Sequence, residues 1–525
     1  IADVLDLRSE AECMLDLWVM GGVSSAQAAK QLPLKDAAKK WLSKMQDRLT
    51  AAKQARDVEA RRLLAAKLCR MKKLYAADIN ETDYSGITPL LHWSAEGYTL
   101  AVSLLLDAGA DASRMAKGGK TAFHLAVQGG HRATALTMSE FEPAKQAMDV
   151  ADDAGRTPVW MVAQRNWMDV MGHLIDKGFN LSRPDDAGLS ATKSTPAHLL
   201  ARNGQADVLK RVAEAGGDVG APDKENKSPA HYACEGNHVE CLRVLAQHGR
   251  GLSEVSVQHQ TPAWVAAERG HIECLQVLAE HGADLSTADS EGGRTPAWLL
   301  AMNGRADAIG ILAGRNADLS SADRQNGRTP AQLLAAKGQS ATLAVLAAAN
   351  ADITSADHTG KTPAHAACEG GHIECLRILA ERDAGLSAAD KENKTPSYLA
   401  SERGFVECVA LLADKSADIW TPDLEDKTPV YAAAQHNHAE VVQLLAAHQS
   451  SGRVDLDACD KMGWTPTWRA AASGHVETLR VLAAHGADLT RAPTAGIFEA
   501  TTPMKRAQQR RHHRVVQFFK QTFSE

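Results

Sequence analysis

The sequence has little that would fill one large globular core. Aromatic residues make up only 5% of its 525 residues, and single cores stop growing near about 250–300 residues. No run of eighteen apolar residues occurs, so nothing is expected to span a membrane. An excess of one charge sign is also lacking, since 58 Lys+Arg against 64 Asp+Glu leave a net charge of -6 and suggest no polyanionic partner. The length therefore favours several domains or an elongated repeat array.

Cysteine usage argues against a disulfide framework. The chain has nine cysteines, an odd number spread over its whole length. We therefore expect reduced thiols and an intracellular, cytoplasmic protein. The sequence opens on Ile1 without an initiator methionine, so a location inside an organelle after removal of a presequence is the alternative.

The dipeptide Thr-Pro, or a close variant of it, recurs along most of the chain. Its first residue stands at Thr88, Thr121, Thr157, Thr195, Ser228, Thr261, Thr295, Thr329, Thr362, Thr395, Thr428 and Thr465. Successive copies are 33 to 38 residues apart, and a further copy follows at Thr502. A period of this length indicates a stack of repeated structural units.

Each unit predicts two helices. The hydroxyl of the first residue suits a helix N-cap, and the proline suits the first helical position, where no N–H is needed. A glycine such as Gly270 predicts the end of this first helix. A second helix is predicted from apolar residues at helical spacing, for example Ile272, Leu275, Val277 and Leu278. Neither helix can bury its apolar face alone, so neighbouring units must stack.

This pattern closely resembles the ankyrin repeat. The family's T-P-L-H-x-A-A-x-x-G-H motif is matched at Thr362–His372 and at Ser228–His238, and its Gly-Ala-Asp motif at Gly282–Asp284. The resemblance covers roughly Thr88 to Glu525. It implies an all-α solenoid of helix-turn-helix units with β-hairpin-like finger loops, and a protein-binding role for the fingers and the concave surface.

The two ends of the chain differ from this pattern. We expect an N-terminal helical extension over residues 1–54, a degenerate capping repeat over 55–87, the repeat array over 88–501 and a polar C-terminal capping helix over 502–525. In the extension, one apolar stripe at helical spacing predicts a long amphipathic helix that docks on a partner or on the first repeats. The stripe consists of Leu34, Ala38, Trp41, Met45 and Leu49.

Two clusters of histidine and cysteine could in principle bind zinc. They are His231, Cys234, His238 and Cys241, and then His365, Cys368, His372 and Cys375. The resemblance instead places His231 and His365 on a histidine that hydrogen-bonds within the repeat, and the cysteines at packed positions. We expect no metal and no cofactor.

Catalytic motifs such as Gly-x-Ser-x-Gly and His-Glu-x-x-His are missing, so no catalytic residue and no enzymatic activity are expected.

A cation stands directly before the first residue of most units, as Lys120, Arg156, Lys227, Arg294, Arg328, Lys361, Lys394 and Lys427. This row could grip an acidic partner, or it could face solvent and the acids of its own loop.

Four units carry a tryptophan in place of the repeat's histidine, namely Trp160, Trp264, Trp298 and Trp468. We expect these tryptophans to be buried with a partner for the indole N–H. Trp167 and Trp464 are better contact candidates.

We therefore interpret the chain as a non-enzymatic scaffold for protein–protein interaction, held as a structural subunit in a large assembly. No small-molecule substrate is expected. The alternatives are an RNA-contacting subunit that uses basic ends, and a regulatory subunit of an enzyme complex. The candidate partner-binding residues are Gln164, Arg165, Trp167, Glu268, Arg269, Arg294, Arg328, Lys361, Glu402, Arg403, Gln435, His436 and Trp464. Insertions after residues 140, 182, 448 and 491 offer further atypical loops.

Overall fold

The computed structural model describes residues 80, 82, 85–107, 109–141, 149–185, 192–448, 455–493 and 501–523. Within these ranges every regular element is a helix, and one isolated β-bridge joins Ala116 and Lys120. None of the helices in the described part is long and apolar enough to cross a membrane. The chain divides into two units, Ile1–Glu254 and Val255–Glu525.

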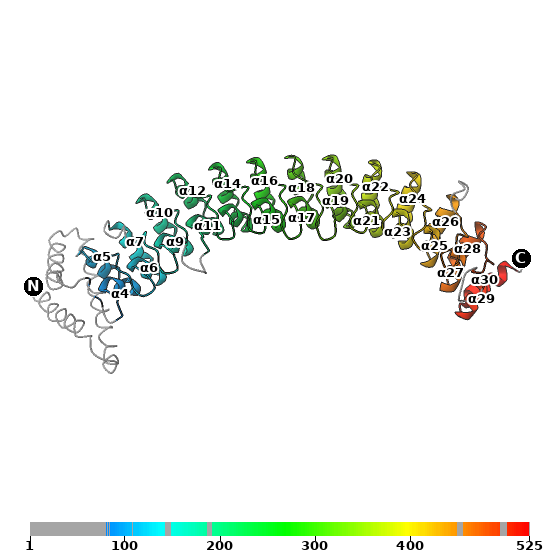
Figure 1. Ribbon diagram of the computed structural model, residues 1–525, viewed down its shortest axis with the longest axis horizontal. Helices are drawn as coiled ribbons and strands as arrows, with labels where there is room; N and C mark the ends of the chain where they lie inside the picture. Colours follow the sequence, from blue (N-terminus) through cyan, green and yellow to red (C-terminus); the bar gives the residue numbers. More distant parts are fainter. Residues whose placement is uncertain are drawn as a thin grey trace, which may run out of the picture. The chain divides into compact units, whose positions relative to one another are not determined.

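The first unit is a stack of helix pairs (Figure 1). First helices of successive pairs pack on one another, and second helices pack on one another in a second layer. The first helices are α4 (Pro89–Glu96), α6 (Ala122–Gln128), α9 (Pro158–Gln164), α11 (Pro196–Arg202) and α13 (Pro229–Glu235). The second helices are α5 (Thr99–Asp107), α7 (Arg132–Glu140), α10 (Met168–Asp176), α12 (Ala206–Glu214) and α14 (Val239–Gln247).

The second unit repeats this arrangement, which is the expected ankyrin-type architecture. Its first helices are α15 (Pro262–Arg269), α17 (Pro296–Asn303), α19 (Pro330–Ala336), α21 (Pro363–Gly370), α23 (Pro396–Arg403), α25 (Pro429–Gln435), α27 (Pro466–Ser473) and α29 (Pro503–Gln509). Its second helices are α16 (Ile272–Glu280), α18 (Ala306–Ala313), α20 (Ser340–Ala348), α22 (Ile373–Glu381), α24 (Val406–Asp414), α26 (Ala439–Ala447), α28 (Val476–Ala484) and α30 (His513–Thr522).

The first helices begin and end as the sequence predicts. Thr261 is an N-cap whose hydroxyl oxygen accepts the N–H of Trp264 at 3.2 Å, and Pro262 occupies the first turn. Gly270 ends the same helix with a φ of 74°. A residue with a side chain rarely adopts this left-handed conformation, which explains the glycine. In some pairs asparagine takes the place instead, as Asn237 does with a φ of 56°.

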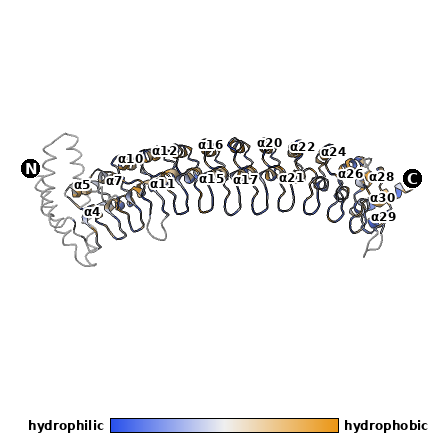
Figure 2. Ribbon diagram, turned by 45° about the horizontal axis from the view of Figure 1, so that its top comes forward, coloured by the Kyte–Doolittle hydropathy of each residue, from blue (hydrophilic) through white to orange (hydrophobic). Residues whose placement is uncertain are grey.

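The core is built largely from small and aliphatic side chains. Ala266 and Ala267 of α15 are fully buried, as are Leu275 and Leu278 of α16. Figure 2 shows the hydrophobic residues on the helices and the hydrophilic ones along the connecting loops. Because alanine lets neighbouring first helices approach closely, small and aliphatic side chains fill most of the interior, and some pairs add a single buried tryptophan or tyrosine. This accounts for the low aromatic content of the sequence.

The loops between a second helix and the next first helix, here called the fingers, are hairpin-like. In one of them the N–H of Asp390 donates to the carbonyl of Lys394 at 2.9 Å, and a carboxylate oxygen of Asp390 accepts the N–H groups of Glu392 and Lys394. Neighbouring fingers are joined by backbone hydrogen bonds. One example is the N–H of Leu424, which donates to the carbonyl of Glu392 at 2.9 Å. In the second unit such bonds join each finger to the next from Gln258 to Lys461.

The C-terminal segment differs from the single capping helix expected over 502–525. It contains two helices, α29 and α30, separated at Arg511, which has a φ of 61°. The left-handed residue breaks the helix where glycine does so in other pairs. Val515 and Phe519 are fully buried, while Lys505, Arg510, Arg514 and Lys520 are exposed. The segment is thus a complete helix pair with a polar outer surface.

Several predicted segments fall outside the described residues. They are the extension over 1–54, nearly all of the capping repeat over 55–87, and most of the loops after residues 140, 182, 448 and 491. The domain boundaries proposed there stay predictions.

Candidate protein-binding surface

In most pairs, the residue three positions after the N-cap links the first helix to the next finger. Trp264 Nε1 donates to the carbonyl of Arg294 at 2.9 Å, and His365 Nε2 lies 3.0 Å from the carbonyl of Lys394. The same bond is made by His124, His198, Trp160, Trp298, Gln332 and Trp468. The predicted burial of the four tryptophans, with a partner for each indole N–H, is confirmed.

Tyrosine fills this position in two consecutive pairs and makes a different bond. The hydroxyl of Tyr398 donates to Asp423 at 2.9 Å, and that of Tyr431 donates to Asp460 at 2.9 Å. Burial raises the pKa of both phenols far above the usual value, and the neighbouring carboxylate adds to this. The tyrosines therefore stay neutral, and their hydroxyl groups hold the fingers through the hydrogen bonds to Asp423 and Asp460.

The cations that precede the first helices are mostly ion-paired. Lys394 Nζ lies 2.9 Å from Glu392, the glutamate two residues earlier. The remaining pairs are Arg156–Asp152, Lys227–Glu225, Arg328–Asp357, Lys361–Glu369 and Lys427–Glu425. Arg294 lies over the ring of Trp298, 5.5 Å from its centre. The fingers thus present paired charges, and the pairing glutamate was not foreseen in the sequence analysis. A partner-binding role for Arg294, Arg328 and Lys361 stays a prediction.

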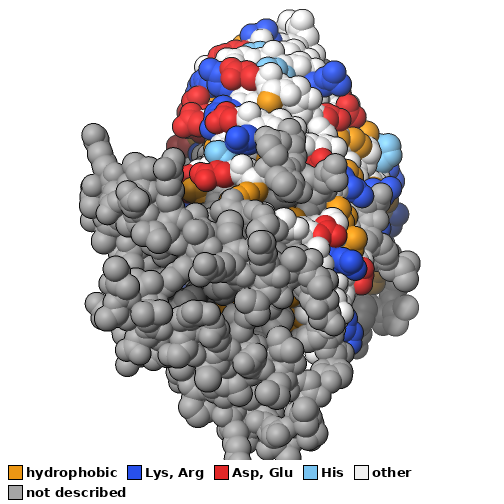
Figure 3. Space-filling model, turned by 90° about the vertical axis from the view of Figure 1, so that its left-hand side faces the viewer, with side chains coloured by type: hydrophobic (Ala, Val, Ile, Leu, Met, Phe, Trp, Pro, Cys, Tyr) orange, Lys and Arg blue, Asp and Glu red, His pale blue; other side chains and the backbone are white. Residues whose placement is uncertain are grey.

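Mixed charge is also visible on the surface. In Figure 3, basic and acidic side chains lie beside one another over the described surface that this view shows. Arg132 and Asp169 form one such pair at 2.7 Å, with both side chains largely open to solvent. Pairs of this kind contribute little stability, because water screens them.

The candidate residues at the ends of the first helices lie at the surface. Gln164, Arg165, Glu268, Arg269, Arg403 and His436 are exposed, and Glu402 and Gln435 are half-buried. Some of them bridge neighbouring pairs. Arg165 donates to the carbonyl of Gln128 at 2.7 Å, and Arg403 lies 3.7 Å from Glu369. The structure therefore places these predicted residues at equivalent surface positions of four helix pairs, of which those that begin with α23 and α25 are neighbours.

The two candidate tryptophans are half-buried. Trp464 stacks on Trp468 with ring centres 4.7 Å apart and planes 8° apart, and Arg469 lies 5.8 Å from the centre of its ring. Trp167 is the N-cap residue of α10. The stripe from Leu34 to Leu49 lies outside the described residues.

The histidines and cysteines do not gather into a metal site. Nδ1 of His365 accepts the N–H of Thr362 at 3.0 Å, so both ring nitrogens are engaged within the repeats. Cys234, Cys241, Cys368 and Cys375 are buried, and none of these four is in a disulfide. Burial raises the pKa of the Cys241 thiol to about 12, helped by Glu240. Throughout the described part of the chain, no three His, Cys, Asp or Glu side chains form a group that could hold a metal.

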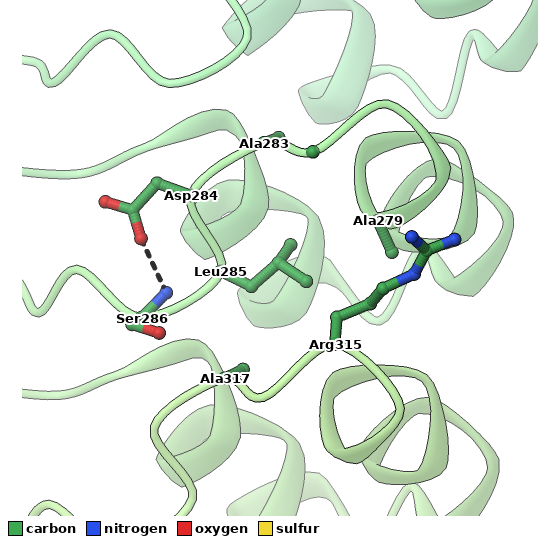
Figure 4. Close-up of a pocket in the computed structure, with 8 residues that line it drawn as sticks. Ala279, Ala283, Asp284, Leu285, Ser286, Arg315 and Ala317 are labelled. Carbon is green, nitrogen blue, oxygen red and sulfur yellow. Dashed lines mark hydrogen bonds between the residues drawn. The ribbon is translucent and has the colours of Figure 1, made fainter.

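Two hollows mark the second unit. One, of about 350 Å³, lies beside the end of α16 and is lined mainly by small residues and backbone. Figure 4 shows Arg315 extending across it toward Ala279, while Asp284 turns away to accept the N–H of Ser286. Its charged lining side chains are Asp284 and Arg315. The other, of about 440 Å³, lies at the fingers around Tyr398 and Tyr431. Glu402 and Gln435, which line it, were predicted as partner-binding residues, but the hollow itself was not predicted, although the recurring Asp-x-Glu-x-Lys of residues 390–394 and 423–427 was a usable signal.

Comparison with known proteins agrees with this geometry. The family described as ankyrin repeats, in three copies, matches residues 197–289, 333–423 and 421–492. A similar protein is the ankyrin repeat and KH domain-containing protein mask-1 of Caenorhabditis elegans. It is 24% identical over 143 residues, which are 27% of this chain. The chain spans only 5% of the length of that relative. With its Thr-Pro helix starts, stacked helix pairs and hairpin-like fingers, this chain is an ankyrin-repeat protein.

Proposed function

We propose that this chain is a non-catalytic scaffold that holds partner proteins by its fingers and the adjoining ends of its first helices. Ankyrin repeats indicate a protein-interaction scaffold and are generally non-catalytic. The finer proposal is that the chain is a structural subunit of a large multiprotein assembly.

One observation carries this proposal, namely where the exposed large apolar side chains lie. Six are found in the described residues, and four of them belong to fingers: Met115, Val257, Leu424 and Met462. A fifth, Met302, lies near the end of the first helix α17. Single exposed apolar residues are ordinary, but a repeated placement along one edge favours a protein-contacting surface.

The test replaces these side chains in the full-length protein. A variant with Val257→Ser, Met302→Ser and Met462→Ser should retain its fold but lose its co-purifying proteins by at least about tenfold, the factor expected if these side chains together contribute no more than about 1.4 kcal/mol. Phe523→Ser is the control, because Phe523 is exposed but lies outside the fingers. Quantitative mass spectrometry of the tagged chain gives the readout. Full retention of the partners by the triple variant would contradict the proposal.

A subunit and an exchanging adaptor differ in their kinetics. A structural subunit should keep its partners at fixed stoichiometry when labelled and unlabelled lysates are mixed, because its dissociation is slow. Complete exchange within minutes would favour the adaptor. The identity of the stable partners would also distinguish a regulatory subunit of an enzyme complex.

The predicted stripe of the N-terminal extension is proposed as a second contact. Trp41→Asp combined with Met45→Lys should reduce partner retention while leaving the repeats folded, because stacked repeats are stabilised by their own neighbours. Unchanged retention and unchanged thermal unfolding would remove this role.

Contact with RNA is the second candidate. Residues 501–523 contain six Lys or Arg and no acidic residue, and Lys505, Arg510 and Arg514 are exposed. Binding through such cations should weaken steeply with salt, with a slope set by the number of neutralised phosphates. Full-length protein that shows no salt-dependent RNA binding would exclude this function.

A cellular location is likewise proposed from the thiols. None of the seven described cysteines is in a disulfide, and six of them are buried, which supports a reducing, intracellular compartment. Cell fractionation would distinguish the cytoplasm from the interior of an organelle.

A further inference from the structure

The hollow of about 440 Å³ lies between two neighbouring fingers and the first helices beside them, all within the second unit. Its lining includes Glu392, Tyr398, Glu402, Glu425, Tyr431 and Gln435. Both tyrosine rings are buried and bonded to aspartates, so the floor of the hollow is fixed. A partner meets a preformed surface here, with little ordering left to do on binding.

Carboxylates outnumber ammonium groups around this hollow by four to two. The side chain of Glu392 is 70% exposed, whereas that of Lys394, its ion-pair partner, is only 21% exposed. Glu425 and Lys427 repeat this difference with 67% and 27%. The charges that a partner reaches first are therefore negative.

Lys394 is held away from an incoming partner. Its Nζ lies 2.9 Å from Glu392 and 5.5 Å from the centre of the Tyr398 ring. Burial opposes its charge, but the hydrogen bond that Lys394 donates to Glu392 and the nearby carboxylates, Glu402 among them, outweigh burial and raise the pKa of Lys394. An anionic ligand would have to break these contacts, whereas a cationic ligand would leave them in place.

The carboxylate of Glu402 has no direct ion-pair partner among the described residues. It stands seven residues after its N-cap threonine, as Glu369 does in the preceding pair. Glu369 is bound by Lys361 at 3.0 Å and by Arg403 at 3.7 Å. Glu402 forms no ion pair within 4.0 Å among the residues that the structure describes. In the first unit the same position is occupied by Arg202, whose guanidinium lies 4.3 Å from the centre of the Tyr232 ring. The helix pair that begins with α11 therefore carries a cation at this position, whereas the pair that begins with α23 carries a carboxylate.

We propose that this hollow binds a cationic segment of a partner protein. An arginine or lysine side chain lies between Glu402 and Glu425, and an apolar neighbour packs on Leu424, which is 57% exposed on the finger. Arginine suits the position best, because its planar donors match carboxylates and the ion is weakly hydrated. This inference rests on the proposed scaffold function, since it names the chemistry of one partner segment.

The test uses the full-length chain and two fluorescent peptides of twelve residues. One repeats Arg-Leu-Ser-Gly, and the other repeats Glu-Leu-Ser-Gly. Fluorescence anisotropy should show binding of the arginine peptide alone, and the affinity should fall as salt rises, since salt screens surface charge. Glu402→Gln combined with Glu425→Gln should weaken binding by about tenfold, the loss expected from about 1.4 kcal/mol of charge-assisted contact. Glu407→Gln is the matched control, because Glu407 is an exposed glutamate in the first turn of α24, in the layer of second helices.

Equal binding of both peptides would overturn the inference, as would an arginine-peptide affinity that Glu402→Gln and Glu425→Gln leave unchanged. Glu402→Arg provides a second variant, which should reduce binding of the arginine peptide further than glutamine does. Circular dichroism of each variant confirms that the repeats remain folded. If the unaltered chain retains protein partners that the double variant also retains, the inference fails while the scaffold function stands. If no protein partner is retained at all, the scaffold function fails.

Discussion

A single side-chain position connects most first helices to the finger that follows them. Histidine, tryptophan and glutamine all fill it, because each can place a donor near the same backbone carbonyl. Gln332 also accepts the N–H of Thr329 through its amide oxygen at 2.8 Å, just as Nδ1 of His365 accepts that of Thr362. The two residues are therefore equivalent in hydrogen bonding and differ in titration.

That difference predicts how acid affects stability. Burial lowers the pKa of His365 below its ordinary value of 6.5, although the Lys394 carbonyl opposes the shift. As pH falls below 6.5, the unfolded chain binds a proton at this residue that the folded chain does not bind. The stabilising contribution of His365 is thus present above pH 6.5 and is lost as pH falls toward the depressed folded pKa.

His365→Gln should consequently reduce the loss of thermal stability between about pH 7.5 and about pH 5. The measurement is the unfolding temperature at each pH, compared with His513→Gln, which replaces an exposed histidine. Some acid sensitivity should persist, because the pKa values of His124, His198, His438 and His475 are also lowered by burial. An acid-induced loss as large in His365→Gln as in the unaltered chain would contradict the argument.

Residue patterns foretold some of these details and not others. The tryptophans could be placed because a fixed distance from the N-cap sets the direction of a helical side chain. Pairing of the cations with acids of their own loop was one of two expectations, but the pairing residue was not identified, since Glu392 and the ring of Tyr398 meet Lys394 only once the finger has folded. The hollow around Glu402 escaped notice for the same reason.

At the scale of the element, glycine decides where the first helices end. Gly404 has a φ of 82°, and an added Cβ would lie 2.3 Å from Nδ1 of His438 on the next pair. Gly486 has the same φ, yet an added Cβ there meets nothing within 4 Å. The two sites separate the conformational cost of a side chain from the cost of a clash.

Gly404→Ala should therefore destabilise the protein more than Gly486→Ala. Both substitutions carry about 1–2 kcal/mol for a left-handed non-glycine residue. The first must also displace the ring of His438, whose Nε2 bonds the carbonyl of Glu402 at 3.1 Å, for about 1 kcal/mol more. Urea unfolding of both variants gives the comparison. Equal midpoints would show that the ring of His438 can move aside without a loss of stability.

Element boundaries were the part of the sequence that could be interpreted most reliably. Threonine, proline and glycine act locally, so the starts and ends of the first helices follow from them. The C-terminal segment was predicted as one helix because Arg511 stands where glycine was expected. The left-handed conformation of Arg511 depends on tertiary packing, in which Val515 and Phe519 of the following helix are buried.

At the scale of the whole molecule, stability is a sum of neighbouring contacts, so the pairs at the ends of a stack are the most vulnerable. The pair α29–α30 covers the preceding one through several groups. Trp468 Nε1 donates to the carbonyl of Thr501 at 2.9 Å, and Arg506 lies 5.3 Å from the centre of the same indole. His512 Nε2 lies 3.1 Å from the carbonyl of Ala472.

Deleting residues 501–525 should therefore expose the apolar surface of α27 and α28. Trp468 is only 4% exposed, Leu479 and Leu482 are fully buried, and Val476 is half-buried. The truncated chain should unfold at a lower temperature and form oligomers, because newly exposed apolar surfaces associate with one another in water. Size-exclusion chromatography with light scattering measures the oligomers. Phe519→Asp should reproduce the effect, since Phe519 is fully buried, whereas Phe523→Asp should not, since Phe523 is 52% exposed. A truncated chain that stays monomeric with an unchanged unfolding temperature would show that α29 and α30 do not protect the stack.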